Sequence, residues 1–302
     1  MKAFQSISEF YGFTKLPAPQ HPLISVLDVA TVPHVAGDES TKLMLNFYSI
    51  AVKRMSNVKV KYGQHSFDFN EGVMSFMSPN QVFSLAVDDK NEEVIKSGWA
   101  IYIHPDFIWN TPLAKTIKQY DFWEYSLHEA LFLSAKEEAV ITNIILTIQQ
   151  ECEANIDQFS KPIIISHLDS LLNYADRFYH RQFITREKAA HHILDRLETV
   201  LNTYFDSADQ MNRGLPSVRY VADQLNLSPK YLSNLLRELT GQNTQQHIHD
   251  KLIERAKEKL VTTNMTISEI AYELGFEHLP SFSKLFKTRT NLSPLAFRAS
   301  FN

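Results

Sequence analysis

Apolar and polar positions divide the chain into three parts. From about residue 20 to residue 110, apolar residues alternate or form short blocks such as LISVLDVA, LMLNFYSIAV and WAIYIH. Turn-forming residues, among them Pro33, Gly63 and Gly98, separate these blocks. Many short strands with such separators are typical of a small sandwich or barrel. We therefore predict a β-domain over roughly residues 1–125.

From about residue 127 to residue 205 the period of the apolar positions is helical. Ser134 and Glu137 have the spacing of a capping box, and an apolar stripe follows them. In the next helix, apolar residues step by 4, 3, 4 and 3 at Ile164, Leu168, Leu171, Ala175 and Phe178. Packing within the chain explains any single helix here, whereas a heptad seam of this length also suits pairing with a second copy. We predict a homodimer through this seam and assign residues 126–205 to a helical dimerisation region.

Polar and turn-forming residues interrupt the helical pattern in NTYFDSADQMNRGLPS. Gly214 and Pro216 close this stretch, and with the preceding Asp and Asn residues they are typical of a loop. We predict a linker over residues 206–216, followed by a separate helical domain over residues 217–302.

An internal repeat occupies the segment after this linker. Apolar positions of a first helix recur 49 residues later, and those of a second helix recur at an offset of 50. The matched pairs are Val218 and Ile267, Val221 and Ile270, Ala222 and Ala271, Leu225 and Leu274, Leu232 and Phe282, Leu235 and Leu285, and Leu236 and Phe286. Each copy is predicted to be a helix, a tight turn and a second helix, with the extra residue in the turn.

Local signals mark the ends of these helices. The turns hold Asn226 and Gly275, residue types that tolerate a positive φ. Thr266 and Glu269 have capping-box spacing. Two further N-caps followed by proline are expected at Ser228-Pro229 and Ser293-Pro294.

One helix, over about Gln245 to Leu260, is expected to join the two copies, with Ile248, Leu252, Ala256 and Leu260 on its buried side. A lone helical hairpin is more often structural than DNA-binding. Two copies joined by a helix of fixed length could hold their second helices about 34 Å apart, which is one DNA turn. Both helices would then enter the major groove from one side.

Two motifs carry a family resemblance: SVRYVADQLNLSPKYLSNLLRELTG and ISEIAYELGFEHLPSFSKLFKTRTNLSPLAFR. Residues 217–298, which contain them, resemble the DNA-binding domain of the AraC/XylS family of bacterial transcription regulators. The resemblance implies two helix-turn-helix units in one polypeptide, each placing its second helix, hereafter the reading helix, in the major groove.

The preceding part of the chain resembles, over shorter motifs, the cupin-like sensing and dimerisation region of some family members. GWAIYIHPDFI and LLNYADRFYHRQFITR look like parts of such regulators in Bacteroidetes-type bacteria. The expected fold class is therefore α+β with two domains. A cupin-like β-barrel with following helices would precede an all-α domain of two helix-turn-helix units joined by a linker helix.

Residue roles in DNA binding follow from helix geometry, with the resemblance fixing the register. In the first reading helix, Asn234 is expected to address an adenine edge, and Lys230, Ser233 and Arg237 share its outward face. The exposed start of the second reading helix is predicted to hold His278, Leu279, Pro280, Ser281 and Lys284. Leu279 and Pro280 depart from the polar residues frequent there, so this unit should form few hydrogen bonds to bases. Lys287 and Arg289 are expected to hold phosphates, with ordinary surface charge as the alternative for any single Lys or Arg.

Charge is unevenly distributed along the chain, whose formal net charge is −4. From residue 206 onward there are 12 Lys and Arg against 10 Asp and Glu, whereas the preceding part has 18 against 24. Such a distribution keeps non-specific DNA affinity low and permits a local basic face. Ordinary surface charge explains these totals equally well.

We expect no catalytic site, metal site or cofactor. Cys152 is the only cysteine, which excludes an internal disulfide and a cysteine cluster. A metal cupin would need a His-x-His motif, whereas His65 is alone in YGQHSFDFNEG. Neither a Gly-rich phosphate loop nor a Gly-x-Ser-x-Gly elbow is present. The protein is therefore predicted not to be an enzyme.

Aromatic residues of the predicted strands are candidates for a non-catalytic pocket: Phe47, Phe67, Phe69, Phe76, Trp99 and Tyr102. Core packing explains each of them singly. As a group inside a small barrel, they could line a cavity for one small effector.

The sequence thus predicts a cytoplasmic, dimeric, sequence-specific DNA-binding transcription regulator, with activation as the expected mode. Its partners would be double-stranded DNA, a second copy of the chain, RNA polymerase and a small-molecule effector. The chain contains no run of about 18 apolar residues and no secretory signal, so no membrane partner is expected. The alternative is a cupin-type enzyme or sugar-binding protein with a helical interaction module.

Overall fold

The computed structural model describes residues 2–32, 42–56, 59–62, 65–68, 72–84, 95–126, 129–154, 157–185, 187–207 and 214–301. The chain divides into two compact units, Met1–Gln182 and Phe183–Asn302. Each unit has a hydrophobic core of its own.

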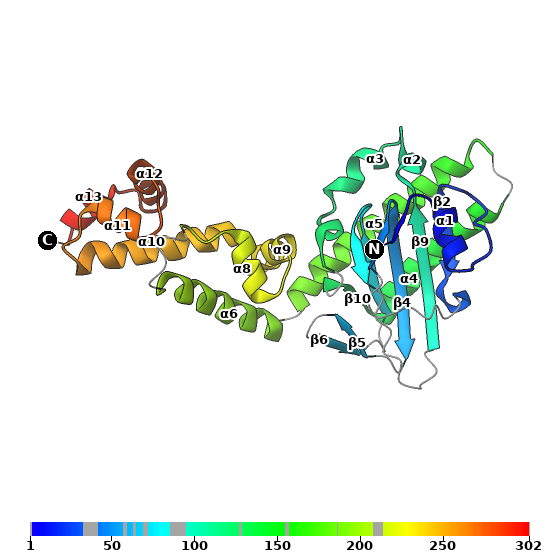
Figure 1. Ribbon diagram of the computed structural model, residues 1–302, viewed down its shortest axis with the longest axis horizontal. Coiled ribbons are helices and arrows are strands. Elements are labelled where there is room, and N and C mark those ends of the chain that lie inside the picture. Colours follow the sequence, from blue (N-terminus) through cyan, green and yellow to red (C-terminus); the bar gives the residue numbers. More distant parts are fainter. Residues whose placement is uncertain are drawn as a thin grey trace. The chain divides into compact units, whose positions relative to one another are not determined.

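Antiparallel pairing dominates the strands of the amino-terminal unit (Figure 1). In the described part of the chain, one sheet has the order β10-β7-β4-β9-β2, a second has the order β1-β3-β8, and β5 pairs with β6. The strands are β1 (Lys2–Phe4), β2 (Ile24–Asp28), β3 (Lys42–Leu45), β4 (Tyr48–Ser56), β5 (Lys59–Tyr62), β6 (His65–Asp68), β7 (Gly72–Met77), β8 (Val82–Ser84), β9 (Ile95–Ile103) and β10 (Leu131–Leu133).

The main sheet is open rather than closed into the predicted β-barrel. Over the described residues, β10 and β2 form its two edges and do not pair with each other. Gly98, which the sequence pattern placed between strands, lies inside β9 opposite Lys53 of β4. Its φ is +122°, and a side chain there would collide with the Val52 carbonyl oxygen. Glycine at this position therefore allows close strand approach instead of marking a turn.

In this unit, helices lie between the strands and after them in the chain. They are α1 (Ile7–Phe13), α2 (Pro105–Ile108), α3 (Leu113–Thr116), α4 (Ala135–Glu153) and α5 (Ser160–Thr185), with 3-10 turns η1 (Val29–Thr31), η2 (Ile117–Gln119) and η3 (Asp121–Glu124). The predicted capping box is confirmed, because Ser134 and Glu137 exchange side-chain and backbone hydrogen bonds at the start of α4. The stripe on α4 buries Ile141, Ile145 and Ile148.

The heptad seam of α5 faces the interior of its own unit. Ile164, Leu168, Leu171, Ala175 and Phe178 are at most 7% exposed in the single chain. Arg181 of α5 forms an ion pair of 2.8 Å with Glu137 of α4, which holds the two helices together. The seam that was expected to pair two chains is thus already buried in the single chain, and a pairing surface would have to lie elsewhere.

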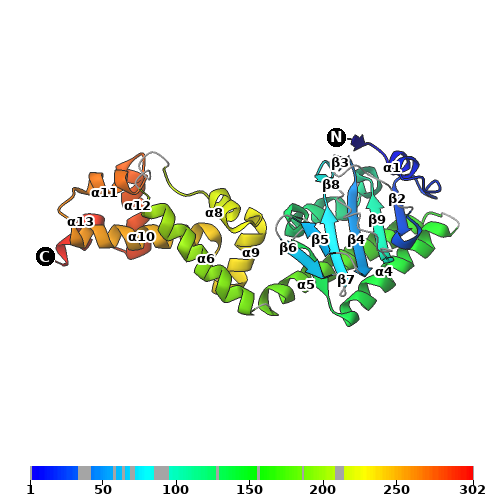
Figure 2. The same cartoon turned by 60° about the horizontal axis from the view of Figure 1, so that its bottom comes forward.

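The carboxyl-terminal unit is helical. Its helices are α6 (Glu187–Phe205), α8 (Val218–Leu225), α9 (Pro229–Thr240), α10 (Thr244–Thr262), α11 (Ile267–Glu273), α12 (Leu279–Thr290) and α13 (Pro294–Ala299). Within this unit, α6 lies alongside α8 and α10 in both views (Figures 1 and 2). The sequence pattern grouped residues up to 205 with the preceding helices, whereas α6 packs with the helices that follow it. Residues 208–213 of the predicted linker lie outside the described residues.

Candidate nucleic-acid interface

Two helix pairs have the same tight turn, as the repeat predicted. Asn226 ends α8 at φ 56°, and Gly275 follows α11 at φ 88°. In each copy, the N–H of the residue after the turn donates a hydrogen bond of 3.0 Å to an alanine carbonyl of the first helix. Leu227 donates to Ala222, and Phe276 donates to Ala271. Positive φ with this six-to-one hydrogen bond is the Schellman ending of a helix. The predicted helix-turn-helix geometry is thereby confirmed for both copies.

The repeat extends to the ends of the reading helices, α9 and α12. The hydroxyls of Thr240 and Thr290 each donate a hydrogen bond of 2.8 Å to the carbonyl oxygen four residues earlier. Each hydroxyl also accepts a bond from the N–H two residues later. Gly241 and Asn291 follow them at φ 74° and φ 61°. Both reading helices therefore stop through the same set of contacts.

The two copies have separate cores, and each core holds the inner face of one reading helix. In α9, Leu232 and Leu236 are fully buried, and in α12 Phe282 and Phe286 are fully buried. The remaining faces of α9 and α12 carry most of the residues predicted to contact DNA. Burial of the inner residues thus fixes which side chains each helix presents outward.

Helix α10 joins the copies, and α6 supports both. Ile248 of α10 lies in the first core, and Leu252, Ala256 and Leu260 lie in the second. The apolar residues of α6 are divided in the same way: Ile193, Leu197 and Leu201 in the first core, and Tyr204 and Phe205 in the second. Two helices therefore cross from one core to the other.

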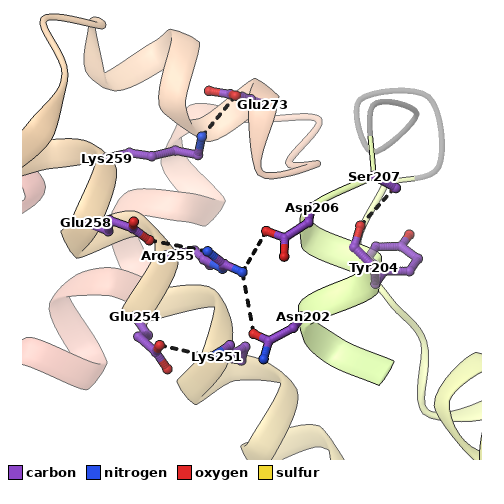
Figure 3. A network of polar contacts seen from close by, with 10 residues as sticks. All are labelled: Asn202, Tyr204, Asp206, Ser207, Lys251, Glu254, Arg255, Glu258, Lys259 and Glu273. Atoms are coloured by element: carbon purple, nitrogen blue, oxygen red, sulfur yellow. Dashed lines mark hydrogen bonds and ion pairs between the residues drawn. The ribbon is translucent and has the colours of Figure 1, made fainter. Parts of the chain in front are cut away.

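Polar contacts reinforce the packing of α6 and α11 on α10 (Figure 3). Arg255 of α10 lies 2.7 Å from Asp206 and donates to Asn202 at 3.4 Å. Lys259 of α10 lies 3.0 Å from Glu273 of α11. These contacts fix the second helix pair to α10 and to the end of α6.

The backbone of Gly214 lies against the turn of the second copy. A Cβ on Gly275 would come within 2.5 Å of the carbonyl oxygen of Gly214. That same oxygen accepts a hydrogen bond of 3.0 Å from the Tyr204 hydroxyl. The segment before α8 therefore passes close to the turn of the second copy.

Comparison with known proteins places this geometry in a family. Residues 221–300 match the family described as a helix-turn-helix domain. The arabinose operon regulatory protein of Escherichia coli (strain K12) is 39% identical over 79 residues, which are 26% of this chain and 27% of that protein. Over its carboxyl-terminal domain, this chain is similar to AraC-type transcription regulators.

Two further proteins are similar to the carboxyl-terminal domain of this chain. The uncharacterized transcriptional regulatory protein YesN of Bacillus subtilis (strain 168) is 35% identical over 94 residues, which are 30% of this chain and 26% of that protein. The carboxyl-terminal domain of the response regulator yesN of Fusobacterium nucleatum is 27% identical, with a TM-score of 0.31 over 35% of this chain and 98% of that one. The chain spans only about a quarter of the curated relatives named above, so the likeness concerns this domain.

The outward residues of α9 form a small polar group. Arg237 is exposed and donates 3.3 Å to the Asn234 side-chain oxygen. The Ser233 hydroxyl lies 3.0 Å from that of Thr244 at the start of α10. Lys230 is half-buried in the first turn. The four residues predicted for this helix therefore share one face, with Ser233 turned toward α10.

The predicted residues of α12 are divided between its surface and its packing. His278, Pro280, Ser281, Lys284 and Lys287 are exposed. Leu279, which the sequence placed on the exposed face, is half-buried and packs against the second core. Arg289 is also half-buried, and its Nη1 lies 3.3 Å from Asp250 of α10. Neither the packing of Leu279 nor the ion pair of Arg289 is visible in the repeat pattern.

Hydrogen bonding and burial shift several pKa values in the carboxyl-terminal unit. The backbone and side chain of Thr266 hold the pKa of Glu269 below its ordinary value, as a charged capping box should. Burial lowers the pKa of His247, whose Nε2 lies 2.8 Å from the Thr240 hydroxyl. Burial, with Arg289 as a second cause, also lowers the pKa of His249. These two histidines are therefore favoured in the neutral form.

The aromatic residues predicted to line a pocket pack in two groups in the amino-terminal unit. Phe47 and Tyr102 are buried in the core that also contains Phe10, and their ring centroids lie 5.7 Å apart. Phe76 packs against Phe122, and their ring centroids lie 4.3 Å apart. Trp99 is half-buried, whereas the side chains of Phe67 and Phe69 lie outside the described residues. The sequence pattern did not single out Phe122, because it lies in a 3-10 turn beyond the strands.

Neither a metal cluster nor a reactive thiol stands out in the part of the chain that the structure describes. No group of three or more His, Cys, Asp or Glu there could hold a metal ion. Burial, with Glu151 and Glu153 as further causes, raises the pKa of Cys152 to about 11. Among the same residues, no helix has the length and apolar content to span a bilayer.

Proposed function

We propose that this protein binds a specific site on double-stranded DNA and thereby regulates transcription. The observation that carries the proposal is the repeated helix pair with matching turns and matching reading-helix ends, in which each reading helix buries one face and presents a polar face. A shared α10 and α6 support both pairs, as recognition of two successive major-groove segments requires.

Base recognition is assigned chiefly to α9, and attachment to the phosphates chiefly to α12. Asn234 and Arg237 can reach base edges as a hydrogen-bonded pair, with Lys230 and Ser233 beside them. On α12, His278, Pro280 and Ser281 are exposed at the helix start, followed by Lys284 and Lys287. Because proline has no donor and Leu279 packs inward, this helix has fewer groups for hydrogen bonds to bases.

The amino-terminal unit is proposed to sense an effector or to pair two chains. The support is its extensive antiparallel sheet, aromatic core and separate compactness, together with the cupin-like resemblance of its sequence. A homodimer, contact with RNA polymerase and a cytoplasmic location follow from the proposed function. An effector would act by binding two states of the protein with different affinity.

Selection of bound sequences from a random pool of duplexes tests the proposal. Enrichment of one discrete site of about 17–20 base pairs, with two conserved segments about one helical turn apart, is the expected result. Recovery of sequences without any common motif, at physiological salt, would refute sequence-specific binding.

A further inference from the structure

One carboxylate connects the two helix-turn-helix units. Asp250 lies near the start of α10, and its Oδ1 is 3.3 Å from Arg289 Nη1, near the end of α12. Its Oδ2 accepts a hydrogen bond of 2.9 Å from Gln242 Nε2. Gln242 follows Gly241, the residue that ends α9. Asp250 therefore joins the carboxyl-terminal ends of both reading helices.

Other hydrogen bonds and ion pairs of α10 in the described part of the chain do not involve α12. At one end of α10, His247 lies 2.8 Å from Thr240, next to the end of α9. At the other end, Lys259 binds Glu273 of α11, and Arg298 of α13 donates 3.0 Å to the Leu260 carbonyl. Within the described residues, Asp250–Arg289 is the ion pair between α10 and α12.

Apolar packing holds α12 from its start to its centre, where Leu279 and Leu285 also pack against the second core. Phe282 and Phe286 anchor the helix in the second core, with ring centroids 5.8 Å apart. A small rotation of α12 about these rings would move Ser281 and Lys284 relative to α9. Arg289 lies beyond the rings, near the end of the helix, so an ion pair there opposes this rotation.

We propose that Asp250 sets the spacing between the two reading helices, with Arg289 as its internal partner instead of a phosphate contact. The inference rests on the proposed DNA-binding function. Base pairs are about 3.4 Å apart along the DNA axis. A displacement of α12 by about that distance would therefore change which base pairs the helix contacts. Asp250 is thus a positioning residue for operator geometry.

Duplexes of different spacing test the proposal. The full-length protein is titrated with its selected site and with versions that have one base pair inserted or removed between the two segments. Asp250→Asn keeps the side-chain size and an acceptor for Gln242 but removes the charge that binds Arg289. We expect the preference for the selected spacing to fall about fivefold, within the range of coupling between residues in contact. Affinity for random duplex and its salt dependence should stay unchanged.

Three variants complete the experiment. Glu254→Gln is the matched control, because Glu254 lies on the same helix and pairs 2.9 Å away with Lys251 of that helix. It should leave the spacing preference intact. Arg289→Gln should give the same loss as Asp250→Asn. The double variant Asp250→Arg with Arg289→Asp should recover the preference, which loss of the fold could not do.

Several results would overturn the proposal. An Asp250→Asn protein with the spacing preference of the wild type would show that the carboxylate does not position α12. Tighter binding of every duplex with a steeper salt dependence would show that Arg289 binds phosphate and that Asp250 competes for it. A wild-type protein that selects no duplex would instead refute the proposed function on which the inference rests.

Discussion

Gly275 meets two separate requirements at one residue. Its φ of 88° lies in the left-handed region, and its missing Cβ makes room for the carbonyl of Gly214. Gly241 meets only the first requirement, because its φ is 74° and nothing lies within 4 Å of the position that a Cβ would take. The two glycines therefore form a matched pair.

Replacing each of these glycines by alanine should separate the two effects. Gly241→Ala is expected to lower the free energy of unfolding by about 1–2 kcal/mol, the cost of a left-handed L-residue. Gly275→Ala should lower it further, since the Gly214 backbone must also move away. Urea unfolding of both variants measures the difference, and equal losses would show that the Gly214 contact carries no energy.

Asn234 and Lys287 are expected to act differently on DNA. Asn234→Ala should cost about 1–3 kcal/mol of binding and relax the preference at one base position, because a base contact distinguishes sequences. Lys287→Ala should weaken binding to all sequences alike and reduce the salt slope by about one, because a phosphate contact does not distinguish them. Titration of the selected site and of single-base variants at several salt concentrations measures both. Equivalent behaviour of the two variants would contradict this division of roles.

At the scale of elements, α6 is the helix whose place the sequence did not reveal. Its apolar face was evident from periodicity, but periodicity does not identify the surface on which a face is buried. The structure places that face against both helix-turn-helix cores. A DNA-binding unit defined from the family motifs alone, which start at residue 217, would omit it.

Truncation should show this contribution of α6. A fragment of residues 183–302 is expected to unfold cooperatively, whereas one of residues 214–302 should unfold at much lower urea concentration or without a cooperative transition. The shorter fragment loses five buried α6 side chains, each stabilising by about 1.5–3 kcal/mol, against a typical domain stability of about 5–15 kcal/mol. Circular dichroism during urea unfolding measures both fragments, and coincident midpoints would disprove the role assigned to α6.

The repeat, the turns and the capping boxes were predictable because their causes are local. Asn226 and Gly275 tolerate positive φ, and Thr266 reaches Glu269 three residues away, whatever surrounds them. Closure of the sheet was not predictable in this way. It depends on whether edge strands such as β2 and β10, more than 100 residues apart, pair with each other. The Asp250–Arg289 contact was not predictable for the same reason, because it joins residues that are far apart in the sequence.

At the scale of the whole molecule, the seam of α5 illustrates the limit of the heptad signal. A stripe with steps of 3 and 4 is apolar whether it faces a second chain or the chain itself. Here the unit covers the stripe with its own residues. Homodimerisation therefore remains a proposal that needs a different surface.

A charged residue in the seam should unfold the amino-terminal unit. Leu171 is fully buried, so Leu171→Glu is expected to cost several kcal/mol and to abolish cooperative unfolding of this unit. Ser170→Glu, on the exposed side of the same helix, serves as the control and should leave the unfolding curve unchanged. Circular dichroism and light scattering report folding and mass. A folded Leu171→Glu monomer beside a dimeric wild type would return the seam to the chain–chain interface.

The identical endings of α9 and α12 have a consequence for engineering. Both helices are 12 residues long and stop at a threonine followed by a left-handed residue, at an offset of 50. The exposed side chains of one helix can therefore be exchanged for those of the other, position by position, while Ser233, Arg289 and the buried leucines and phenylalanines remain in place. A chain altered in this way would recognise an operator whose two halves occur in reversed order.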